Sequence, residues 1–184
     1  MRYRKLGDTL YVKGRIGWKG LKKREYLSDG NYRIINGSNI VSNNIDWNNC
    51  GYVTEERYEE SPEIMLREND ILITKDGTIG KVALVKKLEK PTTRASGLFL
   101  LRNTDPEKWD TLYLFYYLQS RRFKEFIHSR IEGSVIPHLY QKDFEDMKLP
   151  KVPLQVQKKI ARKLDSIQRK IELNNRINAN LVAC

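Results

Sequence analysis

The chain has 184 residues, of which 40% are hydrophobic and 31% are charged, and its formal net charge at pH 7 is +11. This composition excludes a disordered chain, and the length suits one domain with an appendage. A positive excess of this size favours a polyanionic partner, most often nucleic acid; the alternative is a basic but inert surface.

Cysteine usage and hydropathy predict a soluble protein of the cytoplasm. The two cysteines, Cys50 and Cys184, are far apart and fit neither a disulfide framework nor a zinc site, so we expect reduced thiols, no metal and no cofactor. The N-terminal segment MRYRKLGDTL lacks the apolar core of a signal peptide, and no apolar run approaches the roughly 20 residues of a membrane helix.

Short strands are expected in the first hundred residues, and helices after them. Four segments combine apolar, often β-branched residues with flanking turn formers: 31–40, 70–74, 81–85 and 96–102. After Asp105-Pro106, apolar residues from Trp109 to Ile127 recur at spacings of three and four, which predicts a helical region. A last short strand is expected at 147–149. The predicted fold is α+β: an irregular, twisted β-rich domain with a helical region over residues 1–152, followed by a long coiled-coil-type helix over 153–184.

Beyond Pro153 a heptad pattern predicts a helix with one apolar seam. Its members alternate at spacings of four and three: Ile160, Leu164, Ile167, Ile171, Asn174, Asn178 and Leu181. Two interpretations remain open. The seam docks on the chain's own domain, or it pairs with a similar helix from another chain or another half of the protein, where buried asparagines would set the register.

Candidate DNA contacts lie in three segments, and the uneven charge along the chain indicates one positive face. In the glycine-rich opening, lysine and arginine suit phosphates and Trp18 either packs on a sugar or anchors the loop; a solvated basic loop is the alternative. In the second segment, from Arg33 to Asn39, asparagine side chains suit hydrogen bonding to adenine; the alternative is that these asparagines simply form a turn. The third follows a strand, but is neither a P-loop nor a dinucleotide fingerprint. The candidates are Lys13, Arg15, Trp18, Lys19, Lys22 and Lys23; Arg33, Asn36, Ser38 and Asn39; and Lys75 and Thr78.

Catalytic motifs are weak in this sequence. Asp143, Asp146 and Lys148 raise the alternative of a small Mg²⁺-dependent nuclease, but their spacing is common by chance in what is predicted to be a loop leading into a strand. His128 and His138 lack a nucleophile motif. We therefore expect a protein that binds and does not catalyse; a helical protein-interaction adaptor is a further alternative.

Several segments, in order, resemble the specificity subunits of type I restriction–modification enzymes. They are the opening Tyr3-Arg4-Lys5-Leu6-Gly7-Asp8; Leu66-Arg67-Glu68-Asn69-Asp70-Ile71-Leu72-Ile73 with Gly77-Thr78-Ile79-Gly80; Gly133-Ser134 with Leu139; and Leu149-Pro150-x-x-Pro153-Leu154-x-x-Gln157 before the long helix. The resemblance covers nearly the whole chain. Asn69 stands where the family usually has glycine, and Val156 where it usually has glutamate.

The resemblance implies a non-catalytic subunit that reads double-stranded DNA. Family members carry two recognition domains, each followed by a long helix; the helices pair antiparallel, space the domains and dock the modification (methyltransferase) subunits, and through the complex the restriction (translocase) subunit. Each domain reads half of a bipartite target. One domain and one helix correspond to a fragment or to a natural half-subunit, and a half-subunit that self-associates through the seam implies a palindromic, interrupted target.

Overall fold

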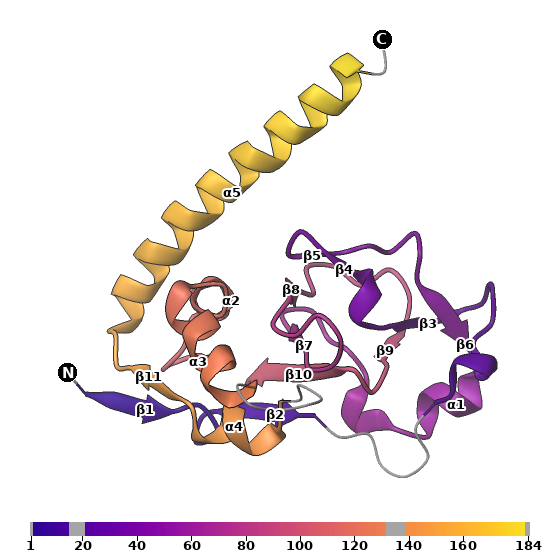
Figure 1. Cartoon of the computed structure of the whole chain (residues 1–184), viewed down its shortest axis with the longest axis horizontal. Coiled ribbons are helices and arrows are strands. Elements are labelled where there is room, and N and C mark those ends of the chain that lie inside the picture. The colour runs from indigo at the N-terminus through magenta and orange to yellow at the C-terminus, as the bar shows by residue number, and fades with distance from the viewer. Residues whose placement is uncertain (1, 15–20, 132–138, 183–184) are drawn as a thin grey trace.

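The computed structural model describes residues 2–14, 21–131 and 139–182. A β-rich body carries three helices on one side, and a single long helix projects from it (Figure 1). The elements are β1 (Tyr3–Lys5), β2 (Leu10–Lys13), η1 (Lys23–Glu25), β3 (Tyr32–Ile35), η2 (Gly37–Asn39), β4 (Ile40–Val41), β5 (Asn44–Ile45), β6 (Gly51–Val53), α1 (Glu55–Glu59), η3 (Pro62–Ile64), β7 (Ile71–Thr74), β8 (Val82–Leu84), β9 (Thr92–Arg94), β10 (Leu98–Asn103), α2 (Thr111–Tyr117), α3 (Arg121–Ile131), α4 (Gln141–Asp146), β11 (Lys148–Pro150) and α5 (Leu154–Val182).

The centre of the body is an antiparallel sheet in the order β2-β10-β7-β8. Successive side chains of a strand point to opposite faces, and here both faces are covered. Ile71 and Ile73 join the core beneath the helices, whereas Leu72 and Leu100 join a second core on the other face. Burial on both faces explains why these strands read as continuous apolar runs, and the expected strands at 70–74, 81–85 and 96–102 are confirmed.

A smaller sheet, β6-β3-β9, and the β4–β5 hairpin lie beside the central sheet. The single strand expected over 31–40 is wrong: β3 ends at Ile35 and a 3-10 turn follows. Asn36 ends the strand because its Oδ1 accepts a hydrogen bond from the Ser38 amide at 2.8 Å, while Asn39 Oδ1 accepts from the Asn36 amide at 2.9 Å. Asparagine side chains compete with the sheet in this way.

The helical region is confirmed and consists of α2 and α3, which pack on the central sheet with α4. Trp109 is fully buried there and donates from Nε1 to Thr9 Oγ1 at 2.7 Å. Residues 141–146 were expected to be a loop; they form α4 instead, because Phe144 inserts into the same core against Phe99, with ring centroids 4.6 Å apart. The expected last strand is β11, which pairs antiparallel with β1.

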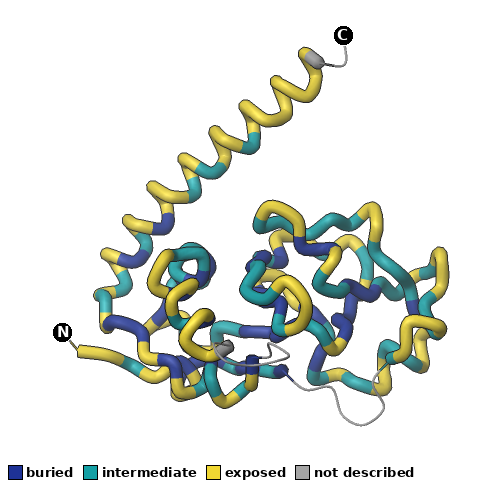
Figure 2. The backbone as a smooth tube through the Cα atoms, viewed as in Figure 1, coloured by how far each residue is buried: buried dark blue, intermediate teal, exposed yellow. Residues whose placement is uncertain are grey.

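The predicted C-terminal helix is confirmed as α5, one uninterrupted helix of 29 residues. A stripe of its residues, Gln157, Ala161, Asp165, Gln168 and Glu172, is buried or half-buried against the body. The predicted seam lies on the adjacent face and is exposed, with Ile167 at 55% and Ile171 at 48% (Figure 2). The interpretation that the seam docks on its own domain is therefore wrong, because the helix docks through a different face.

No helix of the described ranges is both long enough and apolar enough to cross a membrane.

Candidate nucleic-acid interface

The turn between β7 and β8 is held together by one buried threonine. Thr74 Oγ1 donates to the Thr78 carbonyl at 2.6 Å and accepts from the Lys81 amide at 2.9 Å. The Thr74 backbone also bonds to Lys81 O at 3.0 Å and to Gly80 N at 2.9 Å. Gly77 (φ +66°) and Gly80 (φ +86°) take left-handed conformations that other residues rarely adopt. The Gly-Thr-Ile-Gly sequence thus forms a well-defined turn that is fixed by the hydrogen bonds of Thr74.

The predicted second and third segments meet at this turn. A Cβ on Gly37 would lie 3.2 Å from Thr74 Cγ2, so the η2 turn packs directly on the side chain of Thr74. Between the two turns lies an open hollow of about 420 Å³, which we call the central hollow; its lining includes Ser38, Thr78 and Lys81. Residues about 40 positions apart in the sequence therefore present two hydroxyls and an ammonium to one depression.

The opening segment begins at a second hollow, of about 530 Å³, whose lining includes Gly14, Lys75 and Lys142. The Gly14 amide donates to Gln141 Oε1 at 3.0 Å, and a Cβ on Gly14 would lie only 2.1 Å from Phe99 Cε1. Only glycine therefore fits at position 14, where this described segment ends. Three further predicted contacts, Arg15, Trp18 and Lys19, lie outside the described residues.

A buried arginine, Arg94, fixes the backbone at Lys13, the first residue of the predicted opening segment. Arg94 donates from Nη2 to the Lys13 carbonyl at 2.8 Å, and from Nη1 to the carbonyls of Ala95 and Leu98. Burial lowers the pKa of the Arg94 guanidinium to about 10, so it stays charged at neutral pH. Carbonyl oxygens accept the hydrogen bonds of this charge, so Arg94 fixes the backbone at Lys13.

The remaining predicted contacts are basic side chains, either exposed or half-buried, and turn residues. Lys22 and Lys23 are exposed at η1, Lys13 lies 3.9 Å from Glu63, and the Arg33 guanidinium stacks over Trp47 at 5.5 Å. Asn36 caps the η2 turn. Asn39 is 2% exposed, and its amide both accepts from Asn36 and donates to Asn49 O at 2.8 Å, which gives it a turn role in place of the predicted contact with DNA.

Two basic residues of this face were not among the predicted contacts. Lys142 precedes the buried Phe144 on a helix that was expected to be a loop, so no pattern marked it. Lys81 follows the Gly-Thr-Ile-Gly motif in a basic stretch of the sequence. Its neighbouring position to that motif is the one signal that would have found it.

The carboxylates proposed for a nuclease are engaged elsewhere. Asp146 pairs with Lys5 at 3.1 Å, and this hydrogen bond lowers the pKa of the Asp146 carboxyl. Asp143 accepts from the Tyr140 amide at 3.0 Å and lies 3.8 Å from Arg130. Within the described ranges no three metal-ligating side chains gather at one point. The arrangement gives the nuclease alternative no support.

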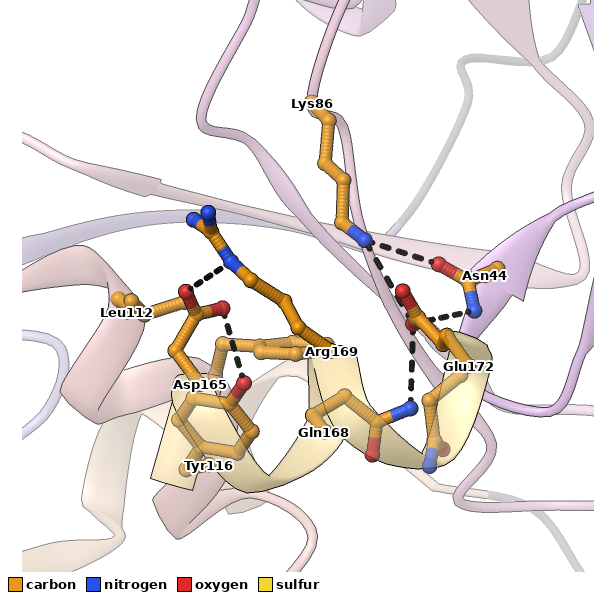
Figure 3. A pocket seen from close by; sticks show the side chains of 10 residues that line it. Asn44, Lys86, Leu112, Tyr116, Asp165, Gln168, Arg169 and Glu172 are labelled. Atoms are coloured by element: carbon orange, nitrogen blue, oxygen red, sulfur yellow. Dashed lines mark hydrogen bonds and ion pairs between the residues drawn. The ribbon is translucent and has the colours of Figure 1, made fainter. Parts of the chain in front are cut away.

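Polar contacts hold α5 against the body (Figure 3). Tyr116 OH donates to Asp165 Oδ1 at 3.2 Å, and Asp165 also pairs with Arg169 at 2.7 Å. Farther along, Glu172 Oε1 accepts from Asn44 Nδ2 at 3.3 Å and lies 3.8 Å from Lys86 Nζ. A pocket of about 210 Å³ lies between these contacts, and Asn43 of the β4–β5 hairpin also lines it.

The family model of the type I restriction modification DNA specificity domain matches residues 2–183. The chain belongs to this family. The MjaVIII specificity subunit of a type I restriction enzyme from Methanocaldococcus jannaschii is 34% identical over 129 residues, which is 65% of this chain and 28% of that protein. The matched region thus spans less than a third of this relative.

Solved structures support the same fold for this specificity domain. A chain from a structure of the type I R-M system superposes with a TM-score of 0.70 at 19% identity, over 97% of this chain and 41% of that one. The HsdS subunit from Thermoanaerobacter tengcongensis superposes with a TM-score of 0.65 at 20% identity, over 95% and 39%. The expected α+β class with a long C-terminal helix is confirmed.

The structure accommodates both departures of this specificity domain from the family pattern. Asn69 has φ +70° and donates its amide to Val85 O at 2.8 Å, a left-handed position that suits glycine best but that asparagine tolerates. Val156 is 43% exposed in the first turn of α5. Gln157, which keeps the family residue, is fully buried: it accepts from the Asp110 amide and donates to Lys108 O and Val152 O.

Proposed function

We propose that this chain recognises double-stranded DNA as part of the specificity subunit of a type I restriction–modification enzyme. The observation that carries the proposal is the central hollow, where Ser38 and Thr78 meet beside Lys81 in a chain of this family. Hydroxyls suit base edges and ammonium groups suit phosphates. Residues 1–152 are proposed as the recognition domain and 153–184 as the helical spacer, acting in the cytoplasm.

The partners follow from the same proposal. The modification subunit would dock on the complete specificity subunit and would be directed to one half of a bipartite target, with the restriction subunit joining through the complex. The matched region is 28% of the first curated relative's length, and the proposal places a second recognition region outside these 184 residues. A second copy of this chain or a non-identical half would supply it.

The exposed seam of α5 supports pairing through this helix. Ile160, Leu164, Ile167 and Ile171 are each at least 38% exposed although α5 is docked, and Leu181 is 70% exposed. Fully burying an exposed side chain of this size contributes roughly 1.5–3 kcal/mol, and the exposed part of each seam residue would contribute a corresponding share, so a matching helix would stabilise the complex. The exposed asparagines Asn174 and Asn178 would fix the register of that pair.

Selection from a random duplex pool tests recognition directly. The purified chain, alone and with its modification subunit, is expected to enrich a defined half-site, and Ser38→Ala is expected to relax the enriched sequence. An adaptor that contacts only proteins would enrich nothing even with the modification subunit present. Plasmid cleavage in Mg²⁺ that is lost in Asp146→Ala would establish the nuclease alternative instead.

A further inference from the structure

We propose that Lys81 is the phosphate-binding residue that fixes the domain on the DNA backbone, with the hollows on either side of it facing base edges. This inference rests on the proposed function and deepens it, because it separates the residue that positions the domain from those that read sequence. Three observations support it: where Lys81 lies, how its backbone is held, and how its charge is balanced.

Lys81 lies where three hollows meet. It lines the central hollow with Ser38 and Thr78, and a second depression of about 250 Å³ with Val41 and Asn43 of the β4–β5 hairpin. It also lines a third, of about 290 Å³, on the side of α3. No other residue of the described chain lines all three of these hollows. A side chain at such a junction contacts any polyanion that spans two of them.

The backbone of Lys81 is fixed on both sides. Its amide donates to the Thr74 hydroxyl at 2.9 Å and its carbonyl accepts from the Thr74 amide at 3.0 Å. Thr74 itself is 1% exposed in the central sheet. The backbone that carries the side chain is therefore already ordered, so binding costs only the conformational entropy of the Lys81 side chain itself.

Lys81 has no ion-pair partner among the residues that the structure describes. Three other lysines of the neighbouring surface have carboxylate partners: Lys75 with Asp76 at 3.4 Å, Lys13 with Glu63 at 3.9 Å and Lys86 with Glu172 at 3.8 Å. Within the described ranges no carboxylate lies within ion-pair distance of Lys81, although Asp76 shares the central hollow. Asp76 pairs with Lys75 instead, so an anion that binds here would meet an ammonium group that no described carboxylate already holds.

The surroundings of Lys81 differ in chemistry on its different sides. Ser38 and Thr78 offer hydroxyls, and Asn43 offers an amide at the hairpin turn, where it adopts φ +62°. The third hollow has an apolar floor that includes Phe123 and a rim that includes Lys124. Amide and hydroxyl groups can read bases, whereas the Lys81 ammonium suits a phosphate, which carries no sequence information.

The test is the salt dependence of binding to duplex DNA of mixed sequence, measured by fluorescence anisotropy with the full chain. One phosphate contact contributes about 0.9 to the slope of log affinity against log salt. Lys81→Ala is therefore expected to lower the slope by about 0.9 and to weaken binding about fivefold at 0.15 M salt and about fifteenfold at 0.05 M. Lys81→Arg keeps the charge and is expected to restore the slope.

Lys87→Ala is the matched control, because Lys87 is 76% exposed beside Glu89 and lines none of the three hollows. Thermal melting first establishes that both variants are folded. Equal slopes of log affinity against log salt for Lys81→Ala and Lys87→Ala would then overturn the inference while leaving the proposed DNA binding intact. A change in the sequence that Lys81→Ala enriches from a random pool would also overturn it. Wild-type chain that binds no duplex, either alone or with the modification subunit, would overturn the proposed function itself, and the inference with it.

Discussion

Asn44 and Glu172 are joined by a hydrogen bond across 128 positions of sequence: Asn44 Nδ2 donates to Glu172 Oε1 at 3.3 Å. Lys86 Nζ completes the group, 3.2 Å from Asn44 Oδ1 and 3.8 Å from Glu172. The β4–β5 hairpin, whose Asn43 lies in the proposed interface, therefore touches the helix proposed for pairing (Figure 3). The carboxylate of Glu172 therefore links the position of α5 to the position of the β4–β5 hairpin.

We predict that this link is lost in acid. Hydrogen bonding by Gln168 and Asn44, with the charges of Lys86 and Arg169, lowers the pKa of Glu172 below its ordinary value of 4.5. A lowered folded-state pKa means that the contact is fully present above the unfolded-state value and is lost as pH falls through the folded-state value. The Asn44 side-chain amide resonance in two-dimensional NMR is expected to shift as pH drops below 4.5.

Glu172→Ala separates this titration from general acid effects. The variant is expected to show the shifted Asn44 resonance at neutral pH and no further change in acid, whereas Glu125→Ala on α3 should titrate like the wild type. An Asn44 resonance that ignores both acid and the Glu172 substitution would show that the hairpin and α5 are not linked through this group.

We predict that Asp70→Ala severely destabilises the domain. Asp70 is fully buried and accepts from Arg102 Nε and Nη2, each at 2.7 Å, and from the Arg67 amide at 2.6 Å. Removing the carboxylate leaves a half-buried guanidinium unpaired, which costs about 3–5 kcal/mol. Urea unfolding measures the loss, and Asp8→Ala, at an exposed position, is the control. A loss for Asp70→Ala no larger than that of the control would refute the structural role of this pair.

We predict that Gln157→Ala loosens the base of α5. Its side-chain amide bonds three backbone groups, of Asp110, Lys108 and Val152, which would all lose their partner. An unsatisfied buried group costs about 1–3 kcal/mol. Amide hydrogen exchange in the first turns of α5 is expected to accelerate, whereas the exposed Gln155→Ala should behave like the wild type. Unchanged protection in Gln157→Ala would mean that other contacts hold the helix.

We predict that the chain self-associates through its seam. Light scattering is expected to give twice the chain mass for the wild type and a single-chain mass for Ile167→Asp with Ile171→Asp, which should weaken pairing more than about 100-fold. Lys163→Ala with Lys170→Ala, which lowers the net charge by the same two units, is the control for charge. A wild type that is monomeric at every concentration would contradict self-association and point to a non-identical half as partner.

The sequence analysis predicted the elements that are marked by the apolar pattern of their own residues. β7, β8 and β10 are apolar on both faces and were found, whereas β1, with the sequence Tyr3-Arg4-Lys5, is a strand only because β11 pairs with it. The central hollow depends on Gly37 packing on Thr74, a contact between distant segments that no periodicity encodes. The seam was predicted, but the docking stripe beside it is mostly polar, so a hydrophobic pattern could not find it.

The two faces of α5 have a geometric consequence. The stripe that ends at Glu172 and the seam that continues to Leu181 belong to one rigid helix, and each residue turns its side chain about 100° from the one before. A helix laid along the seam thus approaches from a side that the body does not occupy. One residue inserted after Glu172 would swing Asn174, Asn178 and Leu181 about 100° away from Ile160 and Ile171, and a straight partner would then meet only half of the seam.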